Sequence, residues 1–230
     1  NRCPPKGEKR PMPTADFFHR YLYALAEIHA SFDLEATENA VVRNAVMLYD
    51  ARGASLMLFN AGEENLIASA TFGLSDAYRA KGTISPRKSL GETIDGAPVI
   101  IRDVASDPRV QYPESALQEG IRSIVGLTLT GGSALVGALR LYFAQPRSFT
   151  PEEMQSLQAL THQAGLSLKK AFYFASMKAA VTDIQQTAAA AKPTLIQRPT
   201  SGVPAATLPK ARIRPWAGGY FEAYVGCWMT

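Results

Sequence analysis

A helical pattern of about 40 residues, running from Thr150 to about residue 191, constrains this chain more than any other feature. Three agreeing signals mark its start: Thr150 can cap the first turn, Pro151 suits the first helical position, and Glu153 completes a capping box. An average helix in a globular protein has only about 12 residues. One small domain cannot cover such a helix along its length, so the sequence predicts a domain with a helical extension.

An approximate heptad repeat follows the same pattern. Its positions are Met154, Leu157, Thr161, Ala164, Leu168, Ala171 and Ala175, and Leu160, Phe172 and Ala179 widen the stripe. Heptad seams pack against other helices. We therefore expect this helix to carry a broad apolar face that one small domain does not cover completely.

The beginning of the chain is typical of two further helices. Apolar residues recur at three- and four-residue steps between Phe17 and Ile28, which predicts the first. Asp33 is placed to cap the second, and Gly53 is expected to end it. Both helices should present one apolar face to a core.

Strand patterns fill much of the middle of the chain. The pattern predicts one hairpin from residues 54–59 and 66–72 and a short strand at Val99–Ile101. It predicts a second hairpin, with glycines in its turn, from residues 123–129 and 135–143. Helices that flank antiparallel hairpins indicate an α+β fold.

Charge is distributed unevenly along the 230 residues, whose net charge is +4. Residues 1–14 carry +3 and residues 176–230 carry +4, whereas residues 15–175 carry −3. A nucleic-acid-binding domain should carry its basic patch on the folded body. The charge distribution therefore disfavours nucleic acid as a partner.

The two cysteines, Cys3 and Cys227, both lie in the terminal regions. Two distant cysteines form no disulfide framework, and without a clustered Cys/His motif a zinc site is disfavoured. The apolar stretches fall short of the about 18 residues that indicate a membrane span, and the basic, proline-rich start is unlike a secretory signal. We expect a cytoplasmic location, including association with a larger or membrane-bound complex.

A series of short motifs between Phe72 and Phe149 identifies a family resemblance. They are Phe72-Gly73-Leu74-Ser75, Ser89-Leu90-Gly91, Pro98-Val99-Ile100-Ile101-Arg102-Asp103, Asp107-Pro108-Arg109 with Tyr112-Pro113, Gly120-Ile121-Arg122-Ser123, Val136-Gly137-Ala138-Leu139-Arg140 and Arg147-Ser148-Phe149. Their order and spacing resemble the GAF domains of regulatory proteins, above all those of bacterial sensor histidine kinases, over residues 17–173. No kinase output domain follows in the residues of this sequence.

The resemblance implies an antiparallel sheet of about six strands, with the first and last helices on one face and a loop-covered pocket on the other. It also implies a homodimer through those two helices. We accordingly divide the chain into an unstructured basic arm at 1–14, a GAF domain at 15–175, a helical extension at 176–191, and a proline-rich linker with an aromatic docking segment at 192–230.

The resemblance places the ligand pocket among the segments between residues 72 and 124. The candidate pocket residues are Phe72, Tyr78, Ser89, Leu90, Ile94, Arg102, Asp103, Arg109, Tyr112, Arg122 and Ile124. Ordinary turn chemistry explains several of them equally well, because aspartate holds backbone N–H groups and proline fixes φ. Arg109 in particular is placed to pair with Asp103 or Asp107.

Departures from the family's best-known ligand sites argue against a cofactor. Bilin-binding members attach their chromophore to a cysteine and the methionine sulfoxide reductases need redox cysteines, but the predicted domain contains none. His19, His29 and His162 fall on the flanking helices, where a haem ligand is not expected. The cyclic-nucleotide signature is absent too, so no cofactor or metal is expected, and an unidentified small molecule stays open.

The C-terminal end carries a cluster of interface-forming side chains. The docking candidates are Arg212, Arg214, Trp216, Tyr220, Phe221, Tyr224 and Trp228. Trp, Tyr and Arg are the residue types that anchor protein interfaces. We expect this segment to bind a partner protein, the alternatives being that it folds back on its own domain or lies on a membrane surface.

Catalytic motifs such as G-x-S-x-G, H-E-x-x-H and the P-loop are missing from the sequence. The hypothesis that follows is a non-catalytic GAF protein that acts by binding, as an interaction or accessory subunit of a larger assembly. The alternative is a sensor of a small molecule that biases a helical dimer.

Overall fold

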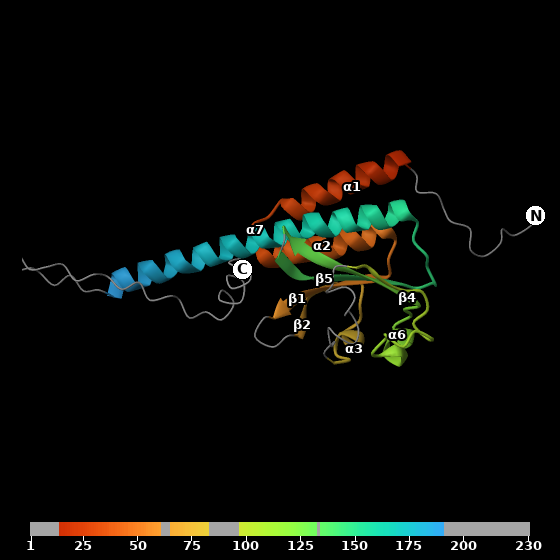
Figure 1. The fold of residues 1–230 in the computed structure, drawn as a ribbon. Helices are drawn as coiled ribbons and strands as arrows, with labels where there is room; N and C mark the ends of the chain where they lie inside the picture. Colours follow the sequence, from red (N-terminus) through yellow and green to blue (C-terminus); the bar gives the residue numbers. More distant parts are fainter. Residues whose placement is uncertain (1–13, 61–64, 83–96, 133, 191–230) are drawn as a thin grey trace, which may run out of the picture. The chain divides into compact units, whose positions relative to one another are not determined.

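The computed structural model describes residues 14–60, 65–82, 97–132 and 134–190 of the chain. Its contacts divide the chain into two units, Asn1–Ala175 and Ser176–Thr230. The first unit holds a sheet with helices on both faces, as Figure 1 shows. The α+β architecture predicted from the sequence is therefore confirmed.

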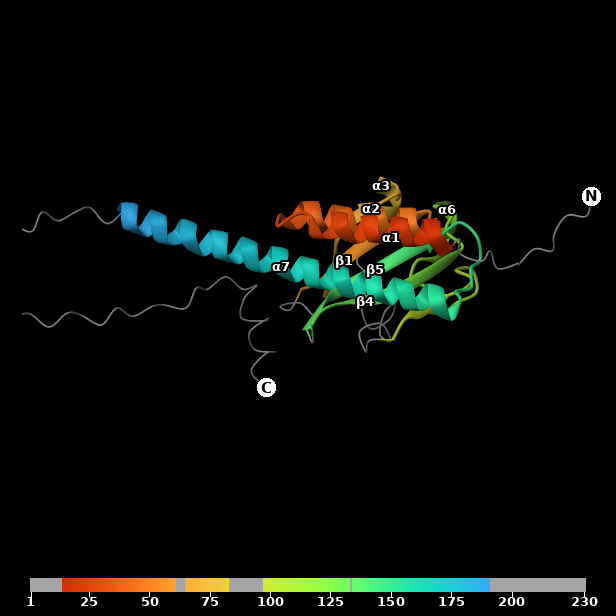
Figure 2. The same cartoon turned by 90° about the horizontal axis from the view of Figure 1, so that it is seen from above.

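Three helices lie on one side of the sheet, with the first in the chain farthest from it (Figures 1 and 2). They are α1 (Thr14–His29), α2 (Leu34–Tyr49) and the part of α7 (Pro151–Ala190) that belongs to the first unit. The carboxylate of Asp33 accepts a hydrogen bond of 2.8 Å from the amide of Ala36, which satisfies one of the free amides in the first turn of α2. The predicted N-cap is thus confirmed.

The end of α2 differs from the prediction. Asp50, not Gly53, is the C-cap, with a φ of 51°, and its amide donates to the carbonyl of Val46. Aspartate is one of the few residues other than glycine that enter this left-handed region. Gly53 instead begins strand β1.

The sheet is antiparallel throughout, with the strand order β2-β1-β5-β4-β3. Its strands are β1 (Gly53–Asn60), β2 (Asn65–Phe72), β3 (Val99–Ile101), β4 (Ser123–Gly131) and β5 (Ala134–Phe143). The two predicted hairpins are β1–β2 and β4–β5, and the predicted short strand is β3. The described residues contain five strands, where the resemblance implied about six, and residues 83–96 lie outside them.

Alternate residues of the central strand β5 belong to two separate clusters. Leu141 and Phe143 pack with the helical layer, whereas Tyr142 packs on the opposite face, where α3 (Asp76–Arg79) and α6 (Pro113–Gln118) lie (Figure 1). This follows from the two-residue repeat of a strand, which sends successive side chains to opposite faces. The sheet therefore separates a helical core from a smaller cluster under the loops.

Most of the predicted heptad seam of α7 faces its own domain. Leu157, Thr161, Ala164, Leu168 and Ala171 are all buried, and Leu157, Ala164 and Leu168 belong to the core between helices and sheet. Small and apolar residues at this spacing suit a sheet as well as a second helix, so pairing with a second chain stays a prediction.

Gly165 brings α7 very close to β4. A Cβ atom at this position would lie 2.6 Å from the carbonyl carbon of Thr130 and 2.8 Å from its nitrogen, and nearer still to its oxygen. Only glycine allows the helix to approach the strand backbone to this distance.

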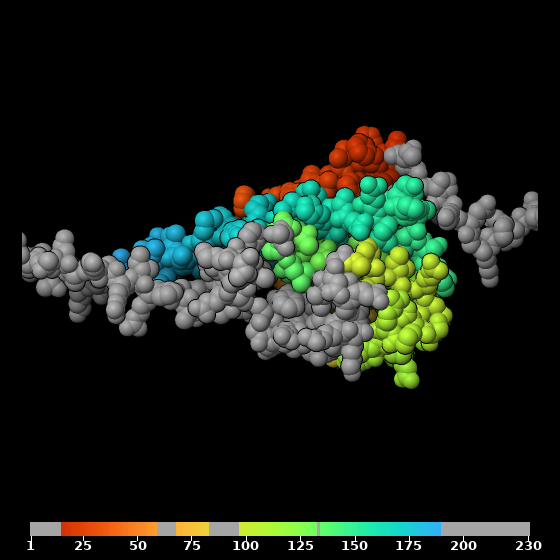
Figure 3. Space-filling view, in the orientation of Figure 1, coloured from red at the N-terminus to blue at the C-terminus, as the bar shows by residue number. Residues whose placement is uncertain are grey.

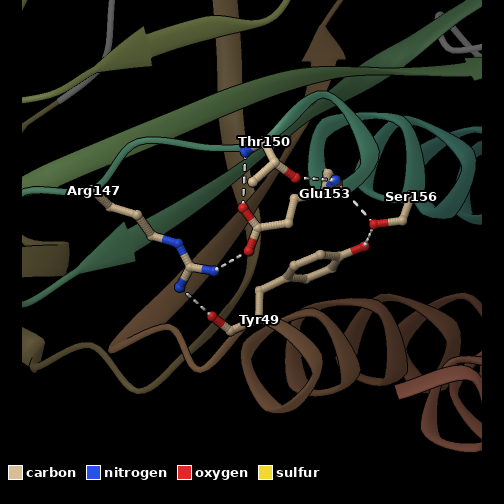
Figure 4. Close-up of polar contacts among 5 residues, drawn as sticks. All are labelled: Tyr49, Arg147, Thr150, Glu153 and Ser156. Atoms are coloured by element: carbon tan, nitrogen blue, oxygen red, sulfur yellow. Dashed lines mark hydrogen bonds and ion pairs between the residues drawn. The ribbon is translucent and has the colours of Figure 1, made fainter. Parts of the chain in front are cut away.

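The start of α7 is tied to the end of α2 by the polar network in Figure 4. The predicted capping box is present: the Thr150 amide donates to Glu153 Oε2 at 2.9 Å, and the Glu153 amide donates to Thr150 Oγ1 at 3.2 Å. Arg147 donates to the carbonyl of Tyr49 at 2.7 Å and to Glu153 Oε1 at 3.2 Å. The Tyr49 hydroxyl lies 3.0 Å from Ser156 Oγ. These contacts fix where the long helix begins.

The second unit is described over residues 176–190, which continue α7 as a helix. Met177, Val181 and Ile184 are each more than half exposed there. No helix among the described residues is both long and apolar enough to cross a membrane.

Candidate functional site

The smaller cluster lies on the sheet face opposite α1 and α2. Its buried members are Tyr78, Val99, Ile101, Val104, Ala116, Ile121, Ile124 and Tyr142. They come from α3, β3, α6, β4, β5 and the connections between them. This is the face on which the sequence predicts the pocket.

Two tyrosines form the centre of this cluster. The rings of Tyr78 and Tyr142 lie 5.7 Å apart and nearly perpendicular, a favourable aromatic geometry. The Tyr142 hydroxyl lies 2.8 Å from Ser55 Oγ on the neighbouring strand β1, so its polar end is satisfied. Burial, followed by the neighbouring Tyr142, raises the pKa of Tyr78 well above its usual value. The Tyr78 phenol therefore stays neutral and shapes the site without carrying charge.

A small cavity of about 20 Å³ opens beside Tyr78. Its lining residues are Tyr78, Lys81, Ile101, Val110, Gln111, Tyr112, Ile124 and Arg140. A cavity needs about 10–15 Å³ to admit one water molecule. The space formed by the described residues thus fits a group of one to a few atoms.

Two cationic side chains line this cavity. Arg140, on β5, is 5% exposed, and Lys81 follows α3 and is half-buried. The Lys81 ammonium lies 3.4 Å from the centre of the Tyr78 ring and donates to the carbonyl of Tyr78 at 3.1 Å. Burial, together with the charge of Arg140, lowers the pKa of Lys81 to about 8, with Glu119 acting in the opposite direction.

Glu119 holds α3 against the domain. Its carboxylate accepts hydrogen bonds from the amide and hydroxyl of Ser75, the N-cap of α3, and pairs with Arg52 at 3.4 Å. Burial raises the pKa of Glu119, but the bonds from Ser75 and Arg52 outweigh it, so this pKa lies below its usual value. The carboxylate fixes the turn from which Tyr78 and Lys81 extend.

The structure brings together three of the residues predicted for the pocket, because Tyr78, Tyr112 and Ile124 all line the cavity. Phe72 is 39% exposed at the end of β2, and Arg102 and Arg122 are exposed. Ser89, Leu90 and Ile94 lie outside the described residues. A ligand contact for any of these residues stays a prediction.

The remaining two predicted residues form turns. Asp103 accepts from the amide of Ala105 at 3.1 Å and from the hydroxyl of Ser106 at 3.2 Å. Arg109 contacts Asp107 through Nε at 3.0 Å and Nη2 at 2.7 Å, and donates to the carbonyl of Ile100 at 3.0 Å. The alternative of turn chemistry accounts for these contacts.

Lys81 and Arg140 were not among the predicted pocket residues. Arg140 had a detectable signal, because it is the single charge in the otherwise apolar strand Ala134–Phe143. A charge in a buried strand is expected only with a specific environment. Lys81 had no comparable signal, since its position depends on how α3 ends.

A larger hollow of about 560 Å³ lies between α1 and α2. It is lined by His19, Arg20, Tyr23, Glu27, Arg43, Asn44, Met47 and Leu48. Its charges are largely satisfied within the domain, since Arg43 pairs with Glu27 and Arg20 donates to the carbonyl of Met47. Among the described residues, no group of three or more His, Cys, Asp or Glu side chains is placed to hold a metal ion.

Comparisons with known proteins agree with this architecture. The family model described as "GAF domain" matches residues 32–169. A search of curated proteins found no significant match.

Solved structures share the fold at low sequence identity. The GAF domain of a phosphoenolpyruvate-protein phosphotransferase from Coxiella burnetii superposes with a TM-score of 0.62 at 16% identity, covering 71% of this chain and 99% of that one. The corresponding Acinetobacter GAF domain gives 0.58 at 16% identity, covering 69% and 96%. The free methionine-R-sulfoxide reductase of Neisseria meningitidis gives 0.60 at 13% identity, covering 72% and 95%.

The matched segment includes α2, the whole sheet and the first half of α7, which is more than half of the chain. This chain belongs to the GAF domain family, a family of regulatory and sensing modules in signalling.

Proposed function

We propose that this protein is a non-catalytic GAF module that works by binding, and that it pairs with a second copy of itself through exposed apolar positions on α1 and α7. The observation that carries the proposal is the amount of apolar surface left on these two helices. Such surface on a folded domain marks an interaction site.

Within the first unit, α1 and α7 lie side by side. Ser167 Oγ donates to the carbonyl of Ile28 at 2.7 Å, and Lys170 donates to the carbonyl of His29 at 2.8 Å. Figure 3 shows both helices at the surface next to each other. Exposed apolar side chains occur on both: Phe18, Leu22, Leu166, Tyr173 and Phe174.

Within the second unit, the helix carries its own apolar stripe. Met177, Val181 and Ile184 are 61%, 53% and 67% exposed, and their spacing of four and three residues is that of a heptad seam. Burying one large apolar side chain contributes about 1.5–3 kcal/mol. Six such side chains from two chains are enough to offset much of the cost of association, which is about 4–15 kcal/mol.

Sedimentation equilibrium of the full chain tests this pairing. The double substitution Met177→Glu/Ile184→Glu should weaken self-association at least tenfold, because it places four carboxylates in the interface of a dimer. The matched control is Thr182→Glu/Gln186→Glu, which adds the same charge at positions about 140° and 180° around the helix from Met177. A monomeric wild-type chain at about 50 μM, or equal behaviour of both variants, would contradict the proposal.

The accessory role extends the same proposal to the aromatic segment at residues 216–230. Support comes from composition alone, since five of its residues are Trp, Tyr or Phe and the segment lies outside the described residues. Truncation after Ala191 should leave the domain folded and remove binding of the partner protein. Unchanged partner binding by the truncated chain in a pull-down would exclude this role.

The cavity favours a second candidate function, the sensing of a small molecule. Lys81 and Arg140 place two cations beside a tyrosine ring, a combination that suits an anionic group. A thermal-shift screen of nucleotides, amino acids and carboxylic acids tests it. A ligand whose stabilising effect is lost on Arg140→Gln, with the variant still folded, would support sensing.

A further inference from the structure

One face of α7 carries four large, exposed apolar side chains in a palindromic order. They are between 36% and 67% exposed, and they are Leu166, Tyr173, Met177 and Ile184. The steps between them are seven, four and seven residues, so the order is the same from either end. At about 100° per residue, these positions fall within about 40° of one another around the helix. The exposed Phe174 and Val181 lie along one edge of this face, which is symmetric about residue 175.

This face points away from the domain core. Ala164 and Leu168, which are buried in the core, lie about 160° and 200° around the helix from Leu166. Closer to the start of α7, the outward side carries Gln155 and His162, which are polar and exposed. The large apolar side chains of this face therefore begin at Leu166, and only the part of α7 from there onward offers them to a partner.

Charge along α7 distinguishes the two orientations in which a second copy could cover this face. Residues 160–175 contain Lys169 and Lys170 and no acidic residue, whereas residues 176–190 contain Lys178 and Asp183, which balance each other. A parallel pair sets both lysines of one copy beside the same two lysines of the other. An antiparallel pair centred on residue 175 sets them beside the neutral stretch, with Asp183 near the turn that holds Lys169. Charges that flank a helical seam set its orientation, so they favour the antiparallel pair.

We propose that two copies pair antiparallel along α7, so that residues 176–190 of each copy lie against residues 160–174 of the other. The inference rests on the proposed self-association and specifies its geometry. Ile184 of one copy then faces Leu166 of the second copy, and Met177 faces Tyr173, which adds a favourable contact between a thioether and an aromatic ring. The Ala190 ends of the two helices point in opposite directions.

Disulfide trapping tests the orientation in the full chain, with Cys3 and Cys227 replaced by serine. One variant carries Ile184→Cys and the other Leu166→Cys. In an antiparallel pair the two introduced thiols lie side by side, as a disulfide requires, so a mixture of the variants should form the bond. In either variant alone the thiols lie about 27 Å apart along the helix axis and should not react. Gln186→Cys, on the opposite side of the helix, is the control for random collision and should not react with Leu166→Cys.

Spin-label distances supply a second measurement that leaves the apolar face intact. Nitroxide labels are attached to Gln186→Cys or Gln158→Cys, both at exposed positions of α7. The antiparallel pair separates two such labels along the helix axis by about 33 Å at position 186 and about 51 Å at position 158. A parallel pair separates them only across two helices, whose axes lie about 8–10 Å apart.

The outcomes separate a failure of this inference from a failure of the proposed pairing. A disulfide found only in the mixture, together with the two long distances, supports the antiparallel pair. A disulfide within either variant alone, or equal short distances at both label positions, would overturn the orientation while self-association stands. A wild-type chain that is monomeric in sedimentation equilibrium would overturn the pairing itself and the orientation with it.

Discussion

Replacing Gly165 by alanine tests how closely α7 approaches the sheet. Intrinsic helix propensity predicts that the substitution stabilises the helix by about 1 kcal/mol, because glycine is the weaker helix former. The structure predicts the opposite sign. The added methyl group would lie 2.6 Å from the carbonyl carbon of Thr130, which is a backbone atom that cannot rotate away.

The expected magnitude follows from the two opposing effects. Overpacking a tight interior costs about 1–3 kcal/mol, and here α7 must move away from β4 over a stretch where Ala164 and Leu168 are fully buried. Subtracting the propensity gain of about 1 kcal/mol from the middle of that range, we expect a net loss of about 1 kcal/mol in the free energy of unfolding, or about 2–4 °C in Tm for a chain of this size. Urea denaturation followed by circular dichroism measures it.

Gln155→Ala is the matched control, since Gln155 is exposed on the same helix and its replacement changes propensity without adding atoms to the interface. The control should be neutral or slightly stabilising. A Gly165→Ala protein as stable as the wild type would show that α7 does not contact the backbone of β4 as closely as described.

The pKa shifts of two carboxylates predict opposite dependences of folding stability on pH. Burial raises the pKa of Glu38, with the Ser69 hydrogen bond opposing, so the folded state disfavours the charged carboxylate and stability falls as pH rises through the folded pKa. The free energy of unfolding of Glu38→Gln, measured by urea titration, should therefore increase relative to that of the wild type between pH 4 and pH 7.5. A relative decrease over this range would contradict the reasoning. The pKa of Glu119 is lowered, so its stabilising contribution is complete above the unfolded pKa and is lost as pH falls through the folded one. Glu119→Gln should accordingly be less stable than the wild type at pH 7, because Ser75 and Arg52 lose a charged acceptor. Near pH 3 the two proteins should be about equally stable. A loss of stability that does not change with pH would refute an electrostatic role.

Local chemistry made much of the fold predictable. The caps at Asp33 and Thr150 were found because a short side chain before an apolar periodic run satisfies free amides, a rule that needs no knowledge of the rest of the chain. The two hairpins followed from glycine-bearing turns between apolar runs. The end of α2 was misplaced because Asp50 enters a backbone region for which the sequence offered Gly53 as the more obvious candidate.

The partner of a helix face could not be predicted from spacing. The repeat from Met154 to Ala175 suits a coiled coil and a sheet surface equally, and only the tertiary structure shows that Leu157 to Ala171 pack inward while Ala175 is exposed. The candidate site was predictable only in part. Tyr112 belongs to a motif and Tyr78 lies three residues after one, whereas the position of Lys81 depends on Glu119 holding α3 from a distant part of the chain.

The alternation of side chains along β5 has a consequence for how such a domain can change over evolution. The cluster that contains Tyr142 and the core that contains Leu141 share no side chain, so a substitution in one leaves the packing of the other intact. Effects of mutations without shared contacts are additive. A lineage can therefore change the side chains around Tyr142 while the helices on the other face keep the same neighbours, so the two faces of the sheet can diverge separately.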